Sequence, residues 1–296
     1  MVALVVALIK LFKLKNMFKT PLVNVVGIGA QKCASSWIYE LLRLHDDVCV
    51  SEIKELNFFS YFYDHGFEWY ESNFSNPKAL NIEISPSYFY NTDTPQRVAQ
   101  YNPNAKIILS LRDPIKRMFS NHLHEVRQGH ITEKNYKFET AFNNNPLYLE
   151  QSLYSKHLKN WLSAFERNQI HIVFQEDVKR FESSVREKLF EFLDLQYGVD
   201  TKVLPVNASV VDRNKTVGTL LNIGGNAMRA LNLEESLVKL KEQGPLSVIY
   251  KNNKLKVSEQ VSKITPEFED KLKKRLKPYN DELKELLDLE NLPWEA

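Results

Sequence analysis

Cysteine is scarce in this sequence. The 296-residue chain contains two cysteines, Cys33 and Cys49. Two thiols in a chain of this length cannot build the disulfide framework that stabilises small secreted domains. We therefore expect both cysteines to be reduced, and from their reduced state we expect a cytoplasmic location.

An excess of charge of one sign is also lacking. The chain carries 39 lysine and arginine residues against 37 aspartate and glutamate residues, a formal net charge of +2. Proteins that bind nucleic acid usually show a pronounced basic excess. We therefore expect no nucleic-acid partner, and any anion must be bound by a local group of residues. No His, Cys and Asp residues have the spacing of metal ligands, so we expect no bound metal.

Long hydrophobic runs are missing as well. The apolar run at residues 2–9 has eight residues, whereas a membrane-spanning helix needs about 20. Lysines follow this run rather than precede it, the reverse of the order in a signal peptide. We interpret residues 1–21 as a loosely packed N-terminal extension, with Met17 as an alternative start. A basic amphipathic helix lying on a membrane is the less favoured interpretation. No stem-like linker precedes the first predicted strand, which argues against a membrane-anchored enzyme of the Golgi type.

The residues that are present follow the pattern of an α/β protein. Hydrophobic residues make up 43% and charged residues 26% of the chain, enough for one substantial core. Four runs rich in Val and Ile are nearly continuous in apolarity, as strands buried on both faces are: residues 23–28, 79–84, 106–111 and 170–174. Helical patterns include residues 35–44, 114–128 and 147–165. This alternation predicts a central, mostly parallel sheet flanked by helices.

The stretch GIGAQKCASS, residues 27–36, has the layout of a phosphate-binding loop between a strand and a helix. A helix N-terminus offers unpaired backbone N–H groups and a partial positive charge. Lys32 adds a full charge, while Ser35 and Ser36 can cap the helix and donate hydroxyl hydrogens to the same anion. The Walker pattern is absent, because the residue directly before Lys32 is not glycine and the residue directly after it carries no hydroxyl. The loop therefore indicates a nucleotide whose transferred group is not handled through Mg²⁺.

A second anion-binding pattern follows the strand predicted at residues 106–111. The strand ends in Arg112, an Asp-Pro pair then starts a helix, and Ser120 lies eight residues after Arg112. This spacing, about two helical turns, lets the Ser120 hydroxyl share an anion with the guanidinium group. We interpret Arg117, on the same helix, as a structural or solvated charge rather than a ligand.

Together the two patterns resemble the PAPS-dependent sulfotransferases. In that family the first loop reads Lys-x-Gly-[Thr/Ser]-[Thr/Ser] and holds the 5′-phosphosulfate of PAPS. Here the loop consists of Lys32, Cys33, Ala34, Ser35 and Ser36. Ala34 replaces the glycine, and we expect its methyl group to crowd the approach of the backbone to the phosphate. The family's second motif binds the 3′-phosphate, which implies this role for Arg112 and Ser120.

The resemblance has consequences for the fold and the cofactor. It implies a P-loop-like nucleotide-binding fold, with PAPS as co-substrate and adenosine 3′,5′-bisphosphate as product. Family members close the nucleotide site with a late basic loop, and the candidates in this chain are Arg213, Lys215 and Gly218. A solvated basic turn is the alternative. We expect residues 22–296 to form one domain, with residues 207–262 as a cap over the acceptor or nucleotide. Pro278 is expected to kink a last helix that begins at Pro266.

The general base distinguishes the branches of this family. The cytosolic small-molecule branch uses a histidine after the third strand, where this chain reads NIEISPSYFY and has none. The chain resembles instead the heparan sulfate branch, which uses a glutamate in a Glu-x-x-Phe-Phe stretch. The stretch SEIKELNFFS places Glu55 at that position. The resemblance implies Glu55 as general base and Lys54 as the residue that steadies the sulfonate or an acidic acceptor. Glu83 and His122 remain alternative bases.

Two further stretches match this branch. SPSYFY is typical of it, although the lysine often found before this run is Ile84 here. Tyr154 begins a Tyr-x-x-x-Leu-x-x-Trp-Leu helix, which implies a supporting role beside the site. We therefore expect a sulfotransferase that moves a sulfuryl group from PAPS to a hydroxyl or amine of a small-molecule or glycan acceptor. A small-molecule P-loop kinase and a non-enzymatic nucleotide-binding protein of the same fold are the alternatives.

Overall fold

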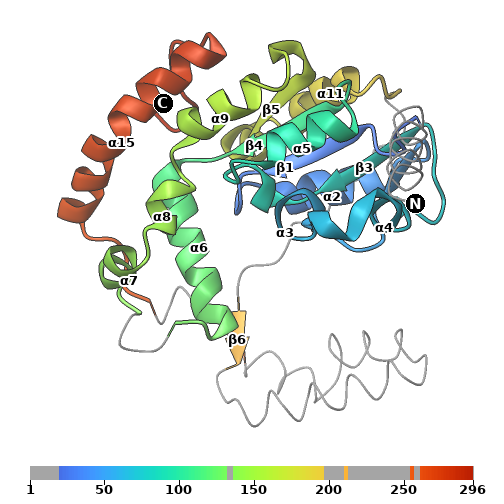
Figure 1. Ribbon diagram of the computed structural model, residues 1–296. Coiled ribbons are helices and arrows are strands. Elements are labelled where there is room, and N and C mark those ends of the chain that lie inside the picture. Colours follow the sequence, from blue (N-terminus) through green and yellow to red (C-terminus); the bar gives the residue numbers. More distant parts are fainter. Residues whose placement is uncertain (1–19, 132–135, 197–209, 213–253, 257–260, 296) are drawn as a thin grey trace, which may run out of the picture. The chain divides into compact units, whose positions relative to one another are not determined.

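The computed structural model describes residues 20–131, 136–196, 210–212, 254–256 and 261–295 (Figure 1). The chain divides into two compact units. The first consists of residues 1–113, 153–204 and 279–296, and the second of residues 114–152 and 205–278. The single domain over residues 22–296 and the cap at residues 207–262 stay predictions, because most of the cap lies outside the described residues.

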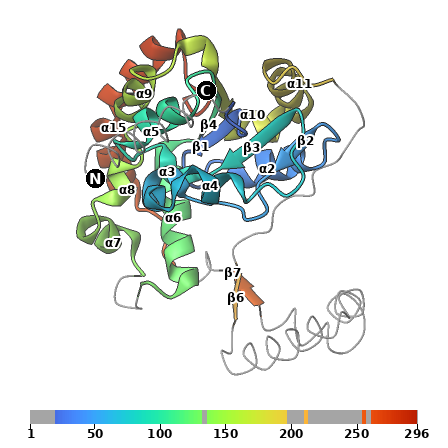
Figure 2. The ribbon, with the colours of Figure 1, turned by 45° about the vertical axis from the view of Figure 1, so that its right-hand side comes forward.

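A five-stranded sheet forms the centre of the first unit (Figure 2). Its strands, in the spatial order β2-β3-β1-β4-β5, are β2 (Val48–Val50), β3 (Leu80–Ile84), β1 (Val25–Gly29), β4 (Lys106–Leu111) and β5 (Ile170–Phe174). Every neighbouring pair is parallel. The predicted α/β fold with a central parallel sheet is therefore confirmed. The sequence did not indicate β2, because three residues are too few to form a recognisable apolar run.

Helices cover both faces of this sheet. They are α2 (Ser35–Arg43), α3 (Phe58–Tyr61), α4 (Gly66–Glu71), α5 (Thr94–Tyr101), α9 (Tyr154–Leu162), α10 (Gln175–Arg180) and α11 (Glu182–Phe192). Val25 of β1 belongs to one hydrophobic cluster with Ile38 of α2, whereas Val26 belongs to a second cluster with Phe58 of α3. Successive residues of a strand point to opposite faces. Burial on both faces explains the continuous apolarity of the strand sequences.

The described part of the second unit contains α6 (Pro114–Gln128), α7 (Phe138–Asn144) and α8 (Leu147–Glu150), and a buried arginine connects α6 to the end of α8. Arg117 of α6 is fully buried. It donates hydrogen bonds to Ser152 Oγ at 2.6 Å, to the Tyr148 carbonyl oxygen at 2.6 Å and to Gln151 Oε1 at 3.2 Å. The interpretation of Arg117 as a structural charge rather than a ligand fits these contacts.

The helix predicted at residues 147–165 is wrong as a single element, because it is divided into α8 and α9. In a continuous helix the Tyr148 carbonyl would accept the Ser152 N–H. Arg117 donates to that carbonyl instead, and the Ser152 N–H donates to the Leu149 carbonyl at 2.8 Å. The buried guanidinium therefore competes for the backbone acceptor and ends the first helix after one turn.

The remaining elements lie late in the chain. Strands β6 (Val210–Asp212) and β7 (Lys254–Lys256) pair antiparallel in the second unit. Helix α15 (Pro266–Leu287) contains Pro278, and Leu283 and Leu287 join the core of the first unit. No helix among the described residues is both long and apolar enough to cross a membrane. The predicted extension at residues 1–21 lies almost wholly outside the described part.

Candidate functional site

The loop between β1 and α2 turns through backbone conformations that favour glycine. Gly29 has a φ of +109°, and a Cβ atom there would lie 2.6 Å from the Pro86 carbonyl oxygen. Lys32 and Ala34 also have positive φ angles, of +68° and +70°. The family's preference for glycine at the position of Ala34 thus has a conformational reason, in addition to the expected crowding by its methyl group. Tight turns of this kind can point successive N–H groups at one anion.

This geometry predicts that Ala34→Gly stabilises the protein. The left-handed conformation costs alanine about 1–2 kcal/mol, which glycine avoids. Glycine also lowers the free energy of unfolding by about 0.4–1 kcal/mol, because it makes the unfolded chain more flexible. We expect a net gain of about 0.5–1 kcal/mol in the free energy of unfolding, measured by denaturant titration. The control is Ala99→Gly within α5, where glycine should cost about 1 kcal/mol. Equal losses in both variants would contradict the argument.

The first turn of α2 has no side-chain cap. Ala34 is the N-cap residue, and Ser35 and Ser36 are the first two helical residues. The prediction that one of these serines caps the helix is therefore wrong. The Ser36 hydroxyl instead accepts a hydrogen bond from Lys54 Nζ at 2.7 Å. A helix N-terminus without a side-chain cap is suited to an anion, because its N–H groups have no side-chain acceptor.

The Tyr154 hydroxyl, at the start of α9, connects this loop to the end of β4. It donates a hydrogen bond to the Arg112 carbonyl oxygen at 2.9 Å and lies 3.7 Å from Cys33 Sγ. Cys33 is fully buried, and its thiol also lies 3.5 Å from the Gln31 carbonyl oxygen. The supporting role inferred for Tyr154 fits these contacts. Cys33 offers a ligand its backbone rather than its side chain.

Arg112 follows β4 directly. Its Nε atom is buried and has no hydrogen-bond partner among the described residues. A buried N–H group without a partner costs free energy, so this atom fits an anion that would pair with it. Ser120 lies on α6 in the second unit, and its pairing with Arg112 stays a prediction. The late-loop candidates Arg213, Lys215 and Gly218 lie outside the described residues.

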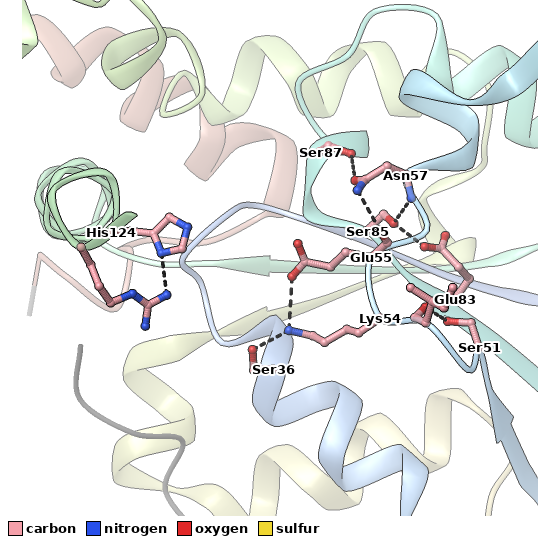
Figure 3. Close-up of polar contacts among 11 residues, drawn as sticks. Ser36, Ser51, Lys54, Glu55, Asn57, Glu83, Ser85, Ser87 and His124 are labelled. Carbon is pink, nitrogen blue, oxygen red and sulfur yellow. Dashed lines mark hydrogen bonds and ion pairs between the residues drawn. The ribbon is translucent and has the colours of Figure 1, made fainter. Parts of the chain in front are cut away.

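Glu55 lies in a strained turn beside the first loop. Its φ is +63°, and two residues later Asn57 has a φ of +54°. Lys54 Nζ lies 3.2 Å from Glu55 Oε1 while it donates to the Ser36 hydroxyl (Figure 3). The side chains of Lys54 and Glu55 are 31% and 42% exposed. One lysine therefore joins the expected phosphate loop to the expected general base.

Residues after β3 hold this turn in place. The Asn57 backbone N–H donates to Ser85 Oγ at 2.8 Å, and Ser87 Oγ donates to Asn57 Oδ1 at 2.6 Å (Figure 3). The Ser85 hydroxyl donates in turn to Glu83 Oε1. Sequence reasoning did not identify Asn57, Ser85 or Ser87. The run SPSYFY was noticed only as a family match, without a role for its serines.

Glu83 is fully buried beneath this turn. Burial, with a smaller contribution from the charge of Glu55, raises the pKa of its carboxyl group to about 8, while hydrogen bonding to Ser85 and Tyr88 opposes the rise. The neighbouring Ile84 packs over Gly27, where a Cβ atom would lie 2.7 Å from Ile84 Cγ1. The position where relatives often carry lysine is thus part of the core.

The alternative base His122 has a different setting in the second unit. Its side chain is fully buried, with Nδ1 3.2 Å from the Tyr148 hydroxyl and Nε2 2.8 Å from the Tyr136 carbonyl oxygen. Burial lowers its pKa. Both ring nitrogens are thus engaged in hydrogen bonds within the fold, which suits a structural histidine. Among the described residues, no three His, Cys, Asp or Glu side chains are grouped to hold a metal ion.

Comparison with known proteins agrees with these motifs. A family model described as the sulfotransferase domain matches residues 24–276. Heparan sulfate glucosamine 3-O-sulfotransferase 5 of Mus musculus is 32% identical over 163 residues, which cover 51% of this chain and 47% of the relative. The bifunctional heparan sulfate N-deacetylase/N-sulfotransferase of Drosophila melanogaster is 29% identical over 216 residues, 62% of this chain and 20% of the relative. The chain thus spans about half or less of these relatives.

A solved structure supports the fold. The sulfotransferase from Alicyclobacillus acidocaldarius matches with a TM-score of 0.52 and 24% identity, over 73% of this chain and 95% of that one. The predicted resemblance to the heparan sulfate and bacterial branch is confirmed, and the kinase alternative is not favoured. The predicted cytoplasmic location is wrong, because the heparan sulfate relatives are Golgi-lumenal enzymes. Two cysteines that form no disulfide say little about a compartment when the fold needs no disulfide.

Proposed function

Because the chain belongs to the sulfotransferase domain family, we propose that it transfers the sulfuryl group of PAPS to a hydroxyl or amine of a glycan or small molecule. Adenosine 3′,5′-bisphosphate is the second product. The observation that carries the proposal is the double contact of Lys54 Nζ, with Ser36 at 2.7 Å and with Glu55 at 3.2 Å. This contact supports the proposal because it joins Ser36, in the proposed phosphate loop, to the carboxylate of Glu55, the proposed base.

The residues of the site fit PAPS. The first turn of α2 has no side-chain cap, Lys32 supplies a full charge in the loop before it, and Arg112 has a buried Nε without a partner among the described residues. The loop at residues 32–36 would hold the 5′-phosphosulfate and Arg112 the 3′-phosphate. When bound, PAPS supplies an activated sulfuryl group whose departure leaves negative charge on the phosphate. Lys32 and the N–H groups of α2 would stabilise that charge.

Glu55 is proposed as the general base. Its half-exposed carboxylate can accept the proton of an acceptor hydroxyl as the oxygen attacks sulfur, and Lys54 beside it can stabilise the sulfonate. Neither step uses a metal ion in this proposal. Support for a carboxylate rather than a histidine comes from the buried, fully engaged setting of His122.

The acceptor class is proposed from the relatives. Both named above act, according to their names, on heparan sulfate. We therefore propose a glycan acceptor, with a small molecule as the alternative, and both O- and N-sulfation fit the site. Purified protein would be incubated with ³⁵S-labelled PAPS and heparan sulfate, N-desulfated heparan sulfate or p-nitrophenol. Label on a polysaccharide supports the proposal, label on p-nitrophenol moves it to small molecules, and failure of all transfer with intact nucleotide binding contradicts it.

Arg112→Ala should weaken PAPS binding selectively. The guanidinium is proposed to pair with the 3′-phosphate, and a charge-assisted hydrogen bond is worth about 1.5–3 kcal/mol, or roughly 10- to 150-fold in affinity. Calorimetric titration would compare adenosine 3′,5′-bisphosphate with adenosine 5′-phosphate, without Mg²⁺. Adenosine 5′-phosphate, which lacks the 3′-phosphate, should bind the variant and the parent protein almost equally.

The matched control is Arg180→Ala, which removes an exposed arginine from α10. It should leave both affinities unchanged. Equal losses for both nucleotides in the Arg112 variant would show that this residue does not read the 3′-phosphate.

A further inference from the structure

The turn that carries Glu55 needs an external support. Glu55 and Asn57 both have left-handed backbone conformations although neither is glycine. Such conformations are unfavourable, above all for glutamate, and persist only where the surroundings fix them. The side chain of Asn57 supplies part of the support, because Nδ2 donates to the Glu55 carbonyl oxygen at 2.7 Å. The rest must come from outside the turn.

Two hydroxyl groups supply that support. Ser85 Oγ accepts the Asn57 N–H at 2.8 Å, and the Tyr88 hydroxyl accepts the Phe59 N–H at 3.2 Å. A hydroxyl group accepts well from one side when its own hydrogen is directed elsewhere. The Ser85 hydroxyl directs its hydrogen toward the buried carboxyl of Glu83, and the Tyr88 hydroxyl interacts electrostatically with the same carboxyl group.

Glu83 thus lies at the centre of the support. Its Oε1 atom accepts from Ser85, and its carboxyl group also contacts Tyr88 and the Leu56 backbone N–H. Its Oε2 atom has no hydrogen-bond partner among the described residues, so the hydrogen bond from Ser85 is the main contact of this carboxyl group. Burying a carboxyl group is costly, and a core position filled by an apolar residue would not be. The fold alone gives no reason for this residue.

We propose that Glu83 is a positioning residue, which sets the Glu55 turn through the Ser85 and Tyr88 hydroxyls. The proposal rests on the proposed function in taking Glu55 as the general base. Glu83 does not exchange a proton with the acceptor in this scheme. Its carboxyl group fixes which way the two hydroxyls point, the hydroxyls fix two backbone N–H groups, and these fix where the Glu55 side chain begins.

The scheme predicts an order among variants. Glu83→Gln keeps an amide oxygen that can accept from Ser85, so its turnover should stay within about threefold of the parent. Glu83→Ala removes the acceptor, and Ser85→Ala removes the hydroxyl. Both should lower kcat about 10- to 100-fold with little change in affinity for adenosine 3′,5′-bisphosphate, because small misplacement of a catalytic group is enough for such a loss. Ser85→Thr keeps the hydroxyl and should restore the rate.

Two measurements test the proposal. Transfer from labelled PAPS to heparan sulfate gives kcat, and amide hydrogen exchange of the purified protein gives the protection of Asn57 and Phe59 without any acceptor. In Glu83→Ala and Ser85→Ala these two amides should exchange about tenfold faster, with distant amides unchanged. If Glu83→Ala fails to fold, the Ser85→Ala and Ser85→Thr pair carries the test. Unchanged exchange in both alanine variants would overturn the proposal.

The kinetic results separate the roles. If Glu83→Gln loses as much rate as Glu83→Ala, then Glu83 transfers protons itself and the positioning role is overturned. In a Glu55→Gln background, adding Glu83→Ala should cost little more, because positioning acts through the base that is already gone. A full additional loss would indicate an independent role and overturn the proposal. Parental turnover of Glu55→Gln alone would instead overturn the proposed base, and the exchange data would still decide whether Glu83 holds the turn.

Discussion

Glu55→Gln is expected to lower turnover by about 10²–10⁴-fold while nucleotide affinity survives. The change keeps the size of the side chain and its hydrogen-bonding oxygen but removes the group that accepts the proton. Lys54 can still contact the amide oxygen and Ser36, so the phosphate loop should keep its shape. Transfer to heparan sulfate gives the rate, and titration with adenosine 3′,5′-bisphosphate gives the affinity.

The matched control is Glu52→Gln, three residues earlier on an exposed part of the same loop. It should retain the parental rate. Parental turnover in the Glu55 variant would make this residue structural. Loss of nucleotide binding together with rate would show that Glu55 supports the loop rather than the chemistry. A small loss has a third explanation, an amine acceptor that is already neutral, and this predicts a larger loss at lower pH.

The second large effect concerns stability. Burial raises the pKa of Glu83 from 4.5 to about 8 in the folded protein. Between these values the folded protein holds a proton that the unfolded chain has released, so the free energy of unfolding falls as pH rises from about 4.5 to about 8 and then levels off. Glu83→Gln removes this loss. It should therefore stabilise the protein at pH 8, by up to about 5 kcal/mol if the whole shift is expressed.

Denaturant titrations at pH 5 and pH 8 would test this expectation. The variant should gain little at pH 5 and most at pH 8. Glu52→Gln again serves as control, because removal of an exposed carboxyl should not change the pH dependence appreciably. The same gain at both values would mean that better packing, rather than the charge of Glu83, explains the effect. A variant less stable at pH 8 would show that the ionised carboxyl is well solvated.

Most of the fold could be predicted from the sequence, because strands buried on both faces have nearly continuous runs of Val and Ile. The break between α8 and α9 could not be predicted. It depends on Arg117 competing for one carbonyl group, and that contact joins residues 31 positions apart. The periodicity of residues 147–165 contains no sign of it.

The site was predictable to a similar degree. The lysine and the glycines of the first loop could be recognised from their spacing between a strand and a helix. Glu55 could be recognised as a candidate base from its resemblance to a family motif. The hydrogen bonds that hold the Glu55 turn could not be found in this way. Ser85 and Asn57 are ordinary loop residues in the sequence, and their role depends on a hydrogen bond across 28 positions. The positive φ angle of Glu55 leaves no trace in residue type, whereas asparagine at position 57 is a type that adopts this conformation more readily.

The order of the strands has a consequence for synthesis of the chain on the ribosome. In the described sheet β1 lies between β3 and β4, both of which are made later, and it pairs with these two strands. β1 must therefore wait until at least residue 111 has emerged before both of its edges are covered, and Leu283 and Leu292 join the same core much later still. Such non-local pairing delays folding and leaves apolar edges exposed meanwhile. A growing chain of this protein should depend on chaperones more than a helical bundle of equal length.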